Sequence, residues 1–371
     1  MDFSRLQRSS TIADEWRYPE AEPNRAGHLG VAEGHRLFWE EYGNPLGDPV
    51  MCLHGGPGAG CSPNMARFFD PARFRIILFD QRGCGKSTPN VAADGPDKAL
   101  ANNSTRHLID DIAGLRAALG ITGKMHVFGG SWGSTLAMAY GIAHPDHCAS
   151  LILRGIFLGT PEDLRYLYQG NAETFETDPY ALTAPGAYIH YPEAWRAFLS
   201  VLTPVERADV IKAYKRLFDM KPGTDAERKR QLNAARAWSL WEGTISNMIP
   251  DTGGVGKFGE DEFALCFAQI EAHYFANDLF LEPDHLLGNA AILARIPIHI
   301  VHGRFDQVCP LTQASRLVEA LRHAGNGPAS FTITHAGHSA VERDTALALT
   351  AIMDALPAIG AESGPTAGSD G

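Results

Sequence analysis

One serine in this sequence stands in a setting that suits nucleophilic chemistry. Ser131 lies within FGGSWGS, between an apolar run and a run of helix-forming residues. This arrangement matches the pattern G-x-S-x-G, in which the serine occupies a sharp strand-to-helix turn with its hydroxyl above the sheet. Small neighbours leave room for the closely approaching backbone of such a turn. A lone match can also be a simple turn, so a catalytic role for Ser131 requires other residues that activate the hydroxyl.

A serine hydroxyl becomes a good nucleophile only beside a base, which is in turn oriented by an acid. In proteins with this turn, the acid and then the histidine follow the serine along the chain. Asp306 ends the apolar stretch IHIVHGRFD, and His338 lies in HAGHS, after the apolar stretch FTIT. His335 competes as the base, but His338 lies deeper in the loop, and we interpret His335 as a strand-end residue. The predicted catalytic residues are Ser131, Asp306 and His338.

A second glycine-rich loop, LHGGPGAG, follows an earlier apolar run. We expect the backbone N–H of Gly56 to join that of Trp132 in an oxyanion hole, with an ordinary loop as the alternative. The helix that begins after Ser131 would add the positive end of its dipole. The stretch DQRGCGKST ends like a phosphate-binding loop, but position 80, where that loop requires glycine, is aspartate. We therefore interpret DQRGCGKST as a strand-to-loop turn.

The elements that must position these residues alternate regularly. Four short apolar runs stop at glycine-containing loops, as buried parallel strands do: VMCLHGG, RIILFDQRG, MHVFGGS and SLILRGIF. The segments between these runs have apolar residues at helical spacing, so strands and helices alternate as in β-α-β units. The strand pattern returns in IPIHIVHGRFD and SFTITHAGHS, before a last helix over ERDTALALTAIMDAL. The predicted fold class is α/β, with a mostly parallel central sheet flanked by helices and the candidate residues at the carboxyl ends of its strands.

The chain divides by composition into a sheet-forming part and an insertion. Residues 160–290 are rich in aromatic and charged residues at helical spacing, and we interpret them as an inserted helical cap domain. The catalytic domain would then comprise residues 1–159 and 291–358. Residues 359–371 are poor in apolar side chains, which predicts a disordered tail.

Composition also limits the partners and the location. The 371 residues are 44% hydrophobic with a net charge of −11, which disfavours nucleic acids and anionic membranes as partners. The acidic start of the chain has no apolar leader segment, and no run is long enough to cross a bilayer, so we expect a cytoplasmic protein. Six cysteines without CxxC pairs predict free thiols and no metal site. The oligomeric state stays open.

Several motifs together resemble a known family. In chain order these are HGGPGAG, FDQRGCGKSTP, FGGSWGSTLAMAY, LILRGIF, HGRFD and AGHS, and they closely resemble the prolyl iminopeptidases, serine peptidases of the α/β-hydrolase fold. The resemblance extends from about Tyr18 to Leu356, with departures at Arg106, where the family usually has tryptophan, and at Phe305, where tyrosine is common. It implies release of N-terminal proline from short peptides through an acyl-enzyme intermediate, without a metal or cofactor. An esterase or amidase of the same fold, with broader acyl specificity, is the alternative.

The resemblance further implies a substrate site in the cap. Glu242 in WSLWEG and Glu271 in QIEAHYF resemble the glutamates that hold the free amino or imino group of the substrate. Paired carboxylates suit a cationic N-terminus because a buried ammonium without partners is strongly penalised, whereas most glutamates simply lie on solvated helix faces. The candidates for the apolar pocket around the proline ring, each of which could instead be ordinary core, are Phe157, Phe275, Cys309 and Tyr168.

Overall fold

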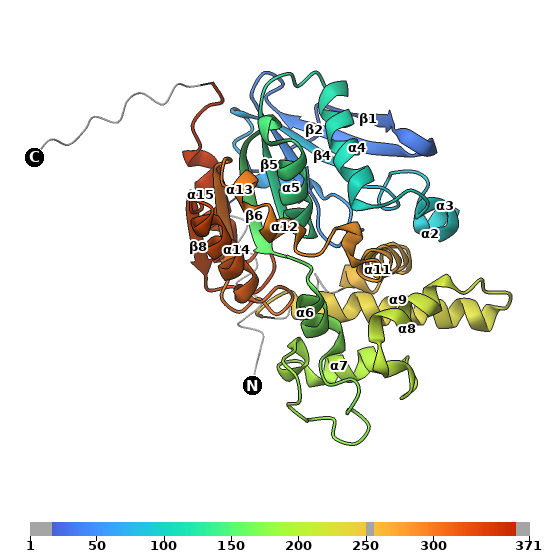
Figure 1. Cartoon of the computed structure of the whole chain (residues 1–371). Coiled ribbons are helices and arrows are strands. Elements are labelled where there is room, and N and C mark those ends of the chain that lie inside the picture. Colours follow the sequence, from blue (N-terminus) through green and yellow to red (C-terminus); the bar gives the residue numbers. More distant parts are fainter. Residues whose placement is uncertain (1–16, 250–255, 361–371) are drawn as a thin grey trace, which may run out of the picture.

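A twisted sheet of eight strands forms the centre of the computed structural model, which describes residues 17–249 and 256–360. The strand order is β1-β2-β4-β3-β5-β6-β7-β8 (Figure 1). The strands are β1 (Arg25–Gly30), β2 (Arg36–Gly43), β3 (Asp48–Leu53), β4 (Phe74–Phe79), β5 (Met125–Ser131), β6 (Cys148–Ile156), β7 (Ile298–Gly303) and β8 (Ser330–Thr334). All neighbours from β4 to β8 in this order are parallel, whereas β1 and β2 pair with each other, and β2 with β4, in antiparallel fashion.

The six apolar runs form the six strands β3 to β8, so the predicted mostly parallel sheet is confirmed. The two antiparallel strands β1 and β2 have no counterpart among those runs. For β1 the physical reason is exposure, since every residue of this edge strand is at least partly accessible to water, whereas β2 buries Leu37 and Tyr42 but carries polar residues between them. An edge strand of this kind does not require a continuous apolar sequence.

Helices cover both faces of the sheet because its strands are apolar on both faces. In β3, Met51 and Leu53 pack in the core on one face, while Val50 and Cys52 pack on the other. The first face is covered by α4 (Thr105–Ala118), α5 (Trp132–Ala143) and α14 (Leu311–His323), and the second by α15 (Arg343–Ala355) with the 3-10 turn η4 (Pro63–Phe68). This arrangement leaves the carboxyl ends of the strands free of these covering helices.

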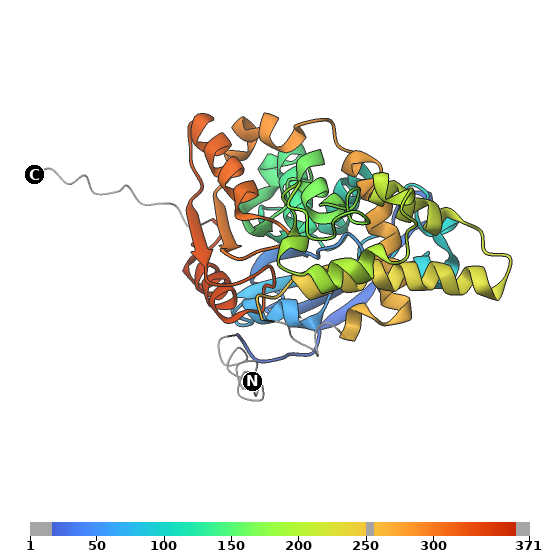
Figure 2. The same ribbon diagram turned by 90° about the horizontal axis from the view of Figure 1, so that it is seen from below.

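The chain between β6 and β7 is mostly helical and gathers at one end of the sheet (Figure 1). Its principal helices are α6 (Pro161–Leu164), α7 (Pro192–Leu199), α8 (Val210–Asp219), α9 (Asp225–Ile245) and α11 (Asp261–Phe275). Seen from that end, the long helix α9 runs across the molecule in front of the sheet (Figure 2). The short helices α12 (His285–Gly288) and α13 (Ala290–Leu293) instead pack against α5. The division into two domains stays a prediction, and the predicted tail falls largely outside the described residues.

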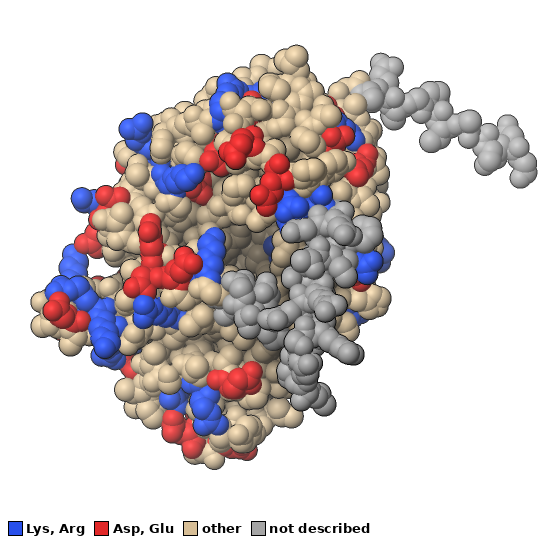
Figure 3. Space-filling model, turned by 180° about the vertical axis from the view of Figure 1, so that it is seen from behind, with Lys and Arg blue, Asp and Glu red and all other residues tan. Residues whose placement is uncertain are grey.

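The surface shows no segregation of charge on the face seen in Figure 3. Lysine and arginine side chains alternate there with aspartate and glutamate, and the face is hollowed near its centre (Figure 3). Within residues 17–249 and 256–360, no helix combines the length and the apolar character needed to cross a membrane.

Candidate active site

Ser131 occupies the turn between β5 and α5 in a backbone conformation that residues other than glycine rarely adopt, with φ +58° and ψ −129°. The surrounding glycines make this turn possible. A Cβ at Gly129 would lie 2.2 Å from the carbonyl oxygen of Gly133, and a Cβ at Gly133 would lie 2.2 Å from that of Leu53. Strand β5, helix α5 and strand β3 therefore approach one another closely enough to hold the strained serine in place.

The predicted base and acid lie in contact at the ends of β8 and β7. His338 Nδ1 is 2.8 Å from Asp306 Oδ2. The other carboxylate oxygen, Oδ1, accepts hydrogen bonds from the backbone N–H groups of Val308 at 3.0 Å and Cys309 at 2.7 Å. Burial alone would raise the pKa of Asp306, but its interaction with His338 and these hydrogen bonds hold it below its ordinary value. The carboxylate is thus ionised and fixed in orientation.

A partly buried arginine that the sequence analysis did not single out also contacts the base. Arg154 Nη1 lies 3.1 Å from His338 Nε2 and donates to the carbonyl oxygen of His338 at 2.8 Å. With Nδ1 facing a carboxylate and Nε2 facing a guanidinium, the partners assign the proton to Nδ1. Burial lowers the pKa of His338, Asp306 opposes this and Arg154 adds to it. The imidazole is therefore neutral and able to accept a proton at Nε2.

The residue before the nucleophile lies against the arginine that contacts the base, since a Cβ on Gly130 would be 2.5 Å from Arg154 Nη2. Among the described residues, no hydrogen bond joins Ser131 Oγ to His338, whose Nε2 faces Arg154 instead. Contacts of this kind are often loose without substrate and tighten in the complex. The signal for Arg154 in the sequence was a single charge inside the apolar strand LILRGIF.

Both predicted oxyanion donors lie beside the serine. Gly56 has φ +104°, and a Cβ there would lie 2.6 Å from the nitrogen of Gly58, so this position requires glycine. The preceding Gly55 faces the nucleophile, since a Cβ on it would be 3.4 Å from that of Ser131. Trp132 begins α5, where backbone N–H groups have no helical acceptor. The loop after β3 and the start of α5 thus flank the serine hydroxyl.

The two glutamates predicted to bind substrate meet in the cap. Tyr168 donates its hydroxyl hydrogen toward Glu242 Oε2, at 2.8 Å, and toward Glu271 Oε2, at 3.3 Å. Trp238, one helical turn before Glu242 in α9, donates its indole N–H to Glu271 Oε2 at 2.6 Å. The remaining oxygen of Glu271, Oε1, is buried and has no hydrogen-bond partner among the described residues. An acceptor of this kind is available for a donor from outside the protein.

Burial makes this carboxylate pair electrostatically unusual. It raises the pKa of Glu242 to about 7, and burial together with the charge of Glu242 raises the pKa of Glu271 well above its ordinary value. The pair therefore retains a proton at neutral pH. A cation bound between the carboxylates would favour full ionisation.

Aromatic rings connect the glutamates with the serine. The ring of Tyr168 stacks on Trp238 with centroids 4.2 Å apart and lies 5.6 Å from Phe275. Phe275 in turn lies 5.8 Å from Phe157, whose backbone N–H donates to Ser134 in α5 at 3.1 Å. These contacts join Tyr168, Phe275 and Phe157 in one continuous aromatic wall between cap and sheet.

Cys309, the fourth candidate for the pocket, is fully buried. Burial and then the charges of Asp306 and Glu242 raise the pKa of its thiol well above the ordinary range. The thiol is therefore protonated. Its backbone N–H, rather than its sulfur, makes the contact with Asp306.

The cap and the loop that carries the base are joined directly. The carbonyl oxygen of Ser246, just after α9, accepts from the backbone N–H groups of His338 and Ser339, both at 2.9 Å. The hydroxyl of Ser246 donates to the carbonyl oxygen of Glu242 at 2.8 Å. Hydrogen bonds through Ser246 thus connect α9, which carries Glu242, with the loop that carries His338.

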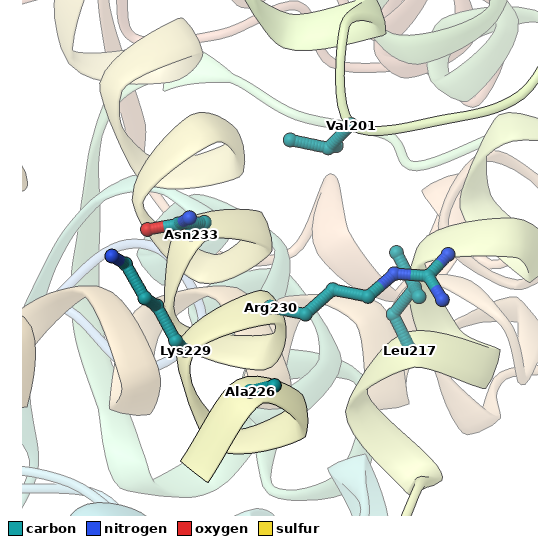
Figure 4. Close-up of a pocket in the computed structure, with 6 residues that line it drawn as sticks. All are labelled: Val201, Leu217, Ala226, Lys229, Arg230 and Asn233. Atoms are coloured by element: carbon teal, nitrogen blue, oxygen red, sulfur yellow. The ribbon is translucent and has the colours of Figure 1, made fainter.

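The cap also carries a surface cavity that is separate from this site. Its volume is about 360 Å³, and Figure 4 shows it beside α9. The lining residues are Val201, Leu217, Ala226, Lys229, Arg230 and Asn233, none of which belongs to the predicted site.

The fold and the serine turn define the class of protein. Residues 48–345 match the model of the alpha/beta hydrolase fold family. An esterase, RhEst1 from Rhodococcus sp. ECU1013, superimposes with a TM-score of 0.57 at 18% identity, covering 90% of this chain and 99% of that one. A putative aryl esterase from Burkholderia cenocepacia gives 0.55 at 16% identity, covering 89% and 97%. At these identities the likeness concerns the fold alone, and the class is that of the α/β hydrolases.

Sequence relatives narrow this class. The proline iminopeptidase of Xylella fastidiosa (strain 9a5c) is 45% identical over 341 residues, which cover 91% of this chain and 98% of the relative. The Arabidopsis thaliana proline iminopeptidase is 40% identical, covering 92% and 82%, and that of Neisseria gonorrhoeae is 39% identical, covering 92% and 99%. The chain belongs to the proline iminopeptidase family.

Proposed function

We propose that this protein is a serine exopeptidase that releases N-terminal proline from short peptides through an acyl-enzyme intermediate. The observation that carries the proposal is the buried pair Glu242 and Glu271, which share the hydroxyl of Tyr168. Buried carboxylates are strongly penalised unless a cation compensates them. The protonated imino group of an N-terminal proline is such a cation, and the aromatic wall beside the pair suits its apolar ring.

Acylation begins when Ser131 Oγ attacks the carbonyl carbon of the N-terminal residue and His338 Nε2 accepts the hydroxyl proton. Asp306 stabilises the resulting imidazolium through its 2.8 Å contact with Nδ1. Arg154 donates to Nε2 in the free protein, so it must leave that nitrogen before the proton arrives. The N–H groups of Gly56 and Trp132 bind the oxyanion.

The intermediate collapses when His338 gives its proton to the nitrogen of the leaving peptide. This breaks the amide bond and leaves a prolyl ester on Ser131. A water molecule then attacks the ester, His338 accepts its proton, and the serine hydroxyl is restored as proline leaves. Each step uses side chains and backbone groups of this chain.

The position of the two glutamates accounts for the restriction to an N-terminus. A residue inside a peptide has a neutral amide nitrogen, which offers no cation to Glu242 and Glu271. Further chain on that nitrogen would also have to enter the aromatic wall around Tyr168. The expected cytoplasmic location and the absence of nucleic-acid and membrane partners stay predictions.

A substrate pair tests the proposal. Purified protein should hydrolyse prolyl-β-naphthylamide and leave its N-acetylated form intact, and Ser131→Ala should abolish the activity. Glu271→Gln should raise KM for the free substrate, because it removes a carboxylate from the cation site. Cleavage of both forms at similar rates, or of simple esters only, would favour the broader esterase or amidase instead.

A further inference from the structure

The stretch DQRGCG, directly after β4, takes no part in the proposed chemistry, yet its second residue bonds to both segments that flank Ser131. Gln81 is buried, and its side-chain Nε2 donates to the carbonyl oxygen of His54 at 3.0 Å. Its Oε1 accepts from the indole N–H of Trp132 at 2.9 Å. Its backbone N–H donates to His54 Nε2 at 3.0 Å. One carboxamide therefore links the loop after β3 with the start of α5.

These bonds are mutually consistent. His54 Nδ1 lies 2.9 Å from the carbonyl oxygen of Gly55, which assigns the ring proton to Nδ1 and leaves Nε2 as the acceptor for Gln81. Burial lowers the pKa of His54, which keeps the ring in this neutral form. Every polar atom of the Gln81 carboxamide thus has a partner of the correct type, so the side chain has one preferred orientation.

The neighbours of Gln81 hold its backbone in place. Asp80 accepts a hydrogen bond from the backbone N–H of Cys61 at 2.7 Å. Arg82 forms two hydrogen bonds with Asp111 in α4, each of 2.7 Å. Gln81 is therefore anchored from both sides and can act as a fixed support.

We infer that Gln81 is a positioning residue of the oxyanion hole, whose carboxamide sets the separation between the N–H groups of Gly56 and Trp132. His54 lies two residues before the first donor, and Trp132 carries the second. Oxyanion donors stabilise a transition state only when they are preorganised at hydrogen-bond distance from the developing charge. This inference rests on the proposed acyl-transfer function.

The test separates effects on the transition state from effects on substrate binding. Gln81→Leu should lower kcat about 10- to 100-fold, approaching the about 100-fold loss that removal of a whole oxyanion donor causes, with KM changed less than about twofold. Gln81→Glu should also lower kcat, because a carboxylate cannot donate to the carbonyl oxygen of His54. Inhibition by a prolyl boronate, which mimics the tetrahedral intermediate, should weaken by the same factor as kcat/KM. Inhibition by proline should not change.

A second variant removes the hydrogen bond between Gln81 and Trp132 by changing its donor instead of its acceptor. Trp132→Phe deletes the indole donor and keeps the backbone N–H, so it should also lower kcat. Combining it with Gln81→Leu should cost little more than either change alone, because both remove one shared contact. If Gln81→Leu fails to fold, Trp132→Phe alone tests the inference, and normal kcat in that variant would contradict it.

The chain offers a matched control in the cap. Asn171 makes the same kind of contacts, with Nδ2 donating to the carbonyl oxygens of Pro179 and Ala181 and Oδ1 accepting from the indole of Trp195 at 2.9 Å. Asn171→Leu should lower the unfolding temperature and leave kcat nearly unchanged.

Three outcomes are informative. A drop in kcat for the Gln81 variants, with boronate affinity falling in parallel, supports the inference. Gln81 variants that keep kcat, or that lose only thermal stability as Asn171→Leu does, overturn the inference about Gln81. The proposed function stands in that case as long as Ser131→Ala is inactive. Activity in Ser131→Ala would overturn the proposed function itself.

Discussion

In the proposed function, substrate binding is coupled to the loss of a proton from the pair Glu242 and Glu271. Burial raises the pKa of Glu242 to about 7, and burial with the charge of Glu242 raises the pKa of Glu271 well above its ordinary value, so the pair holds a proton at neutral pH. A prolyl cation should displace the proton. We predict that prolinamide binds Ser131→Ala more tightly as pH rises through about 7, and that binding at neutral pH releases a proton to the solvent. Calorimetry in buffers of different ionisation enthalpy measures both quantities.

Glu242→Gln in the same Ser131→Ala background is the control for this prediction. It should bind prolinamide weakly at every pH, and the increase in affinity near pH 7 should be lost. Affinity that does not change with pH in the parent, or a dependence that survives Glu242→Gln, would contradict the assignment of the proton to this pair.

The charge of Arg154 should be visible in the pH profile. Its proximity lowers the pKa of His338, which must be neutral to act as the base. Arg154→Met should raise that pKa and move the acid limb of kcat/KM toward higher pH. Arg154→Lys keeps the charge and should leave the limb near its original position. An acid limb that shifts equally in both variants would mean that packing, rather than charge, is responsible.

At the scale of elements, the features that could be predicted from the sequence are those encoded by residues close together in the chain. Strands β3 to β8 are contiguous apolar runs, and the serine turn is a contiguous glycine pattern, so both could be predicted. Arg154 and His338 are 184 positions apart, and Gln81 and Trp132 are 51 apart. Contacts over such separations depend on the strand order, which no local spacing reveals.

The close packing of β5, α5 and β3 gives a sharp contrast between two glycines. A Cβ at Gly133 would lie 2.2 Å from the carbonyl oxygen of Leu53, whereas a Cβ at Gly114 in α4 would meet nothing within 4 Å. Gly133→Ala should therefore abolish activity and lower the unfolding temperature strongly. Gly114→Ala should keep activity and stabilise the protein by about 0.5–1 kcal/mol. Thermal unfolding and kcat measure both, and a Gly133→Ala protein with normal activity would refute the packing of the turn.

At the scale of the whole molecule, we propose that the cap completes the site by contributing the glutamate pair. The helical spacing of residues 160–290 predicted that the cap is helical. It did not predict that α9 and α11 contact each other, which the structure shows. The family resemblance, not the spacing, singled out Glu242 and Glu271. Without it, both would have been assigned to solvated helix faces, whereas the structure buries them.

The bonds between cap and base predict a long-range effect of one half-buried carboxylate. Glu342 accepts from the backbone N–H of Met248 in the cap at 3.0 Å and from that of Gly337 beside the base at 2.6 Å. An amide has only one acceptor oxygen, so Glu342→Gln should leave one N–H without its protein partner and cost about 0.5–1.5 kcal/mol. We expect a lower unfolding temperature and a lower kcat. The exposed Glu262→Gln is the control, and equal effects of both changes would contradict this link.

The central claim is that Ser131 carries a prolyl group during turnover. The most direct measurement is acid quenching of the protein during hydrolysis of prolyl-β-naphthylamide, followed by peptide mapping with mass spectrometry. The account predicts one prolyl group on the peptide that contains Ser131, absent from Ser131→Ala and from reactions with the N-acetylated substrate. A prolyl group on another residue, such as Cys309, or acylation by the N-acetylated substrate as well, would contradict it.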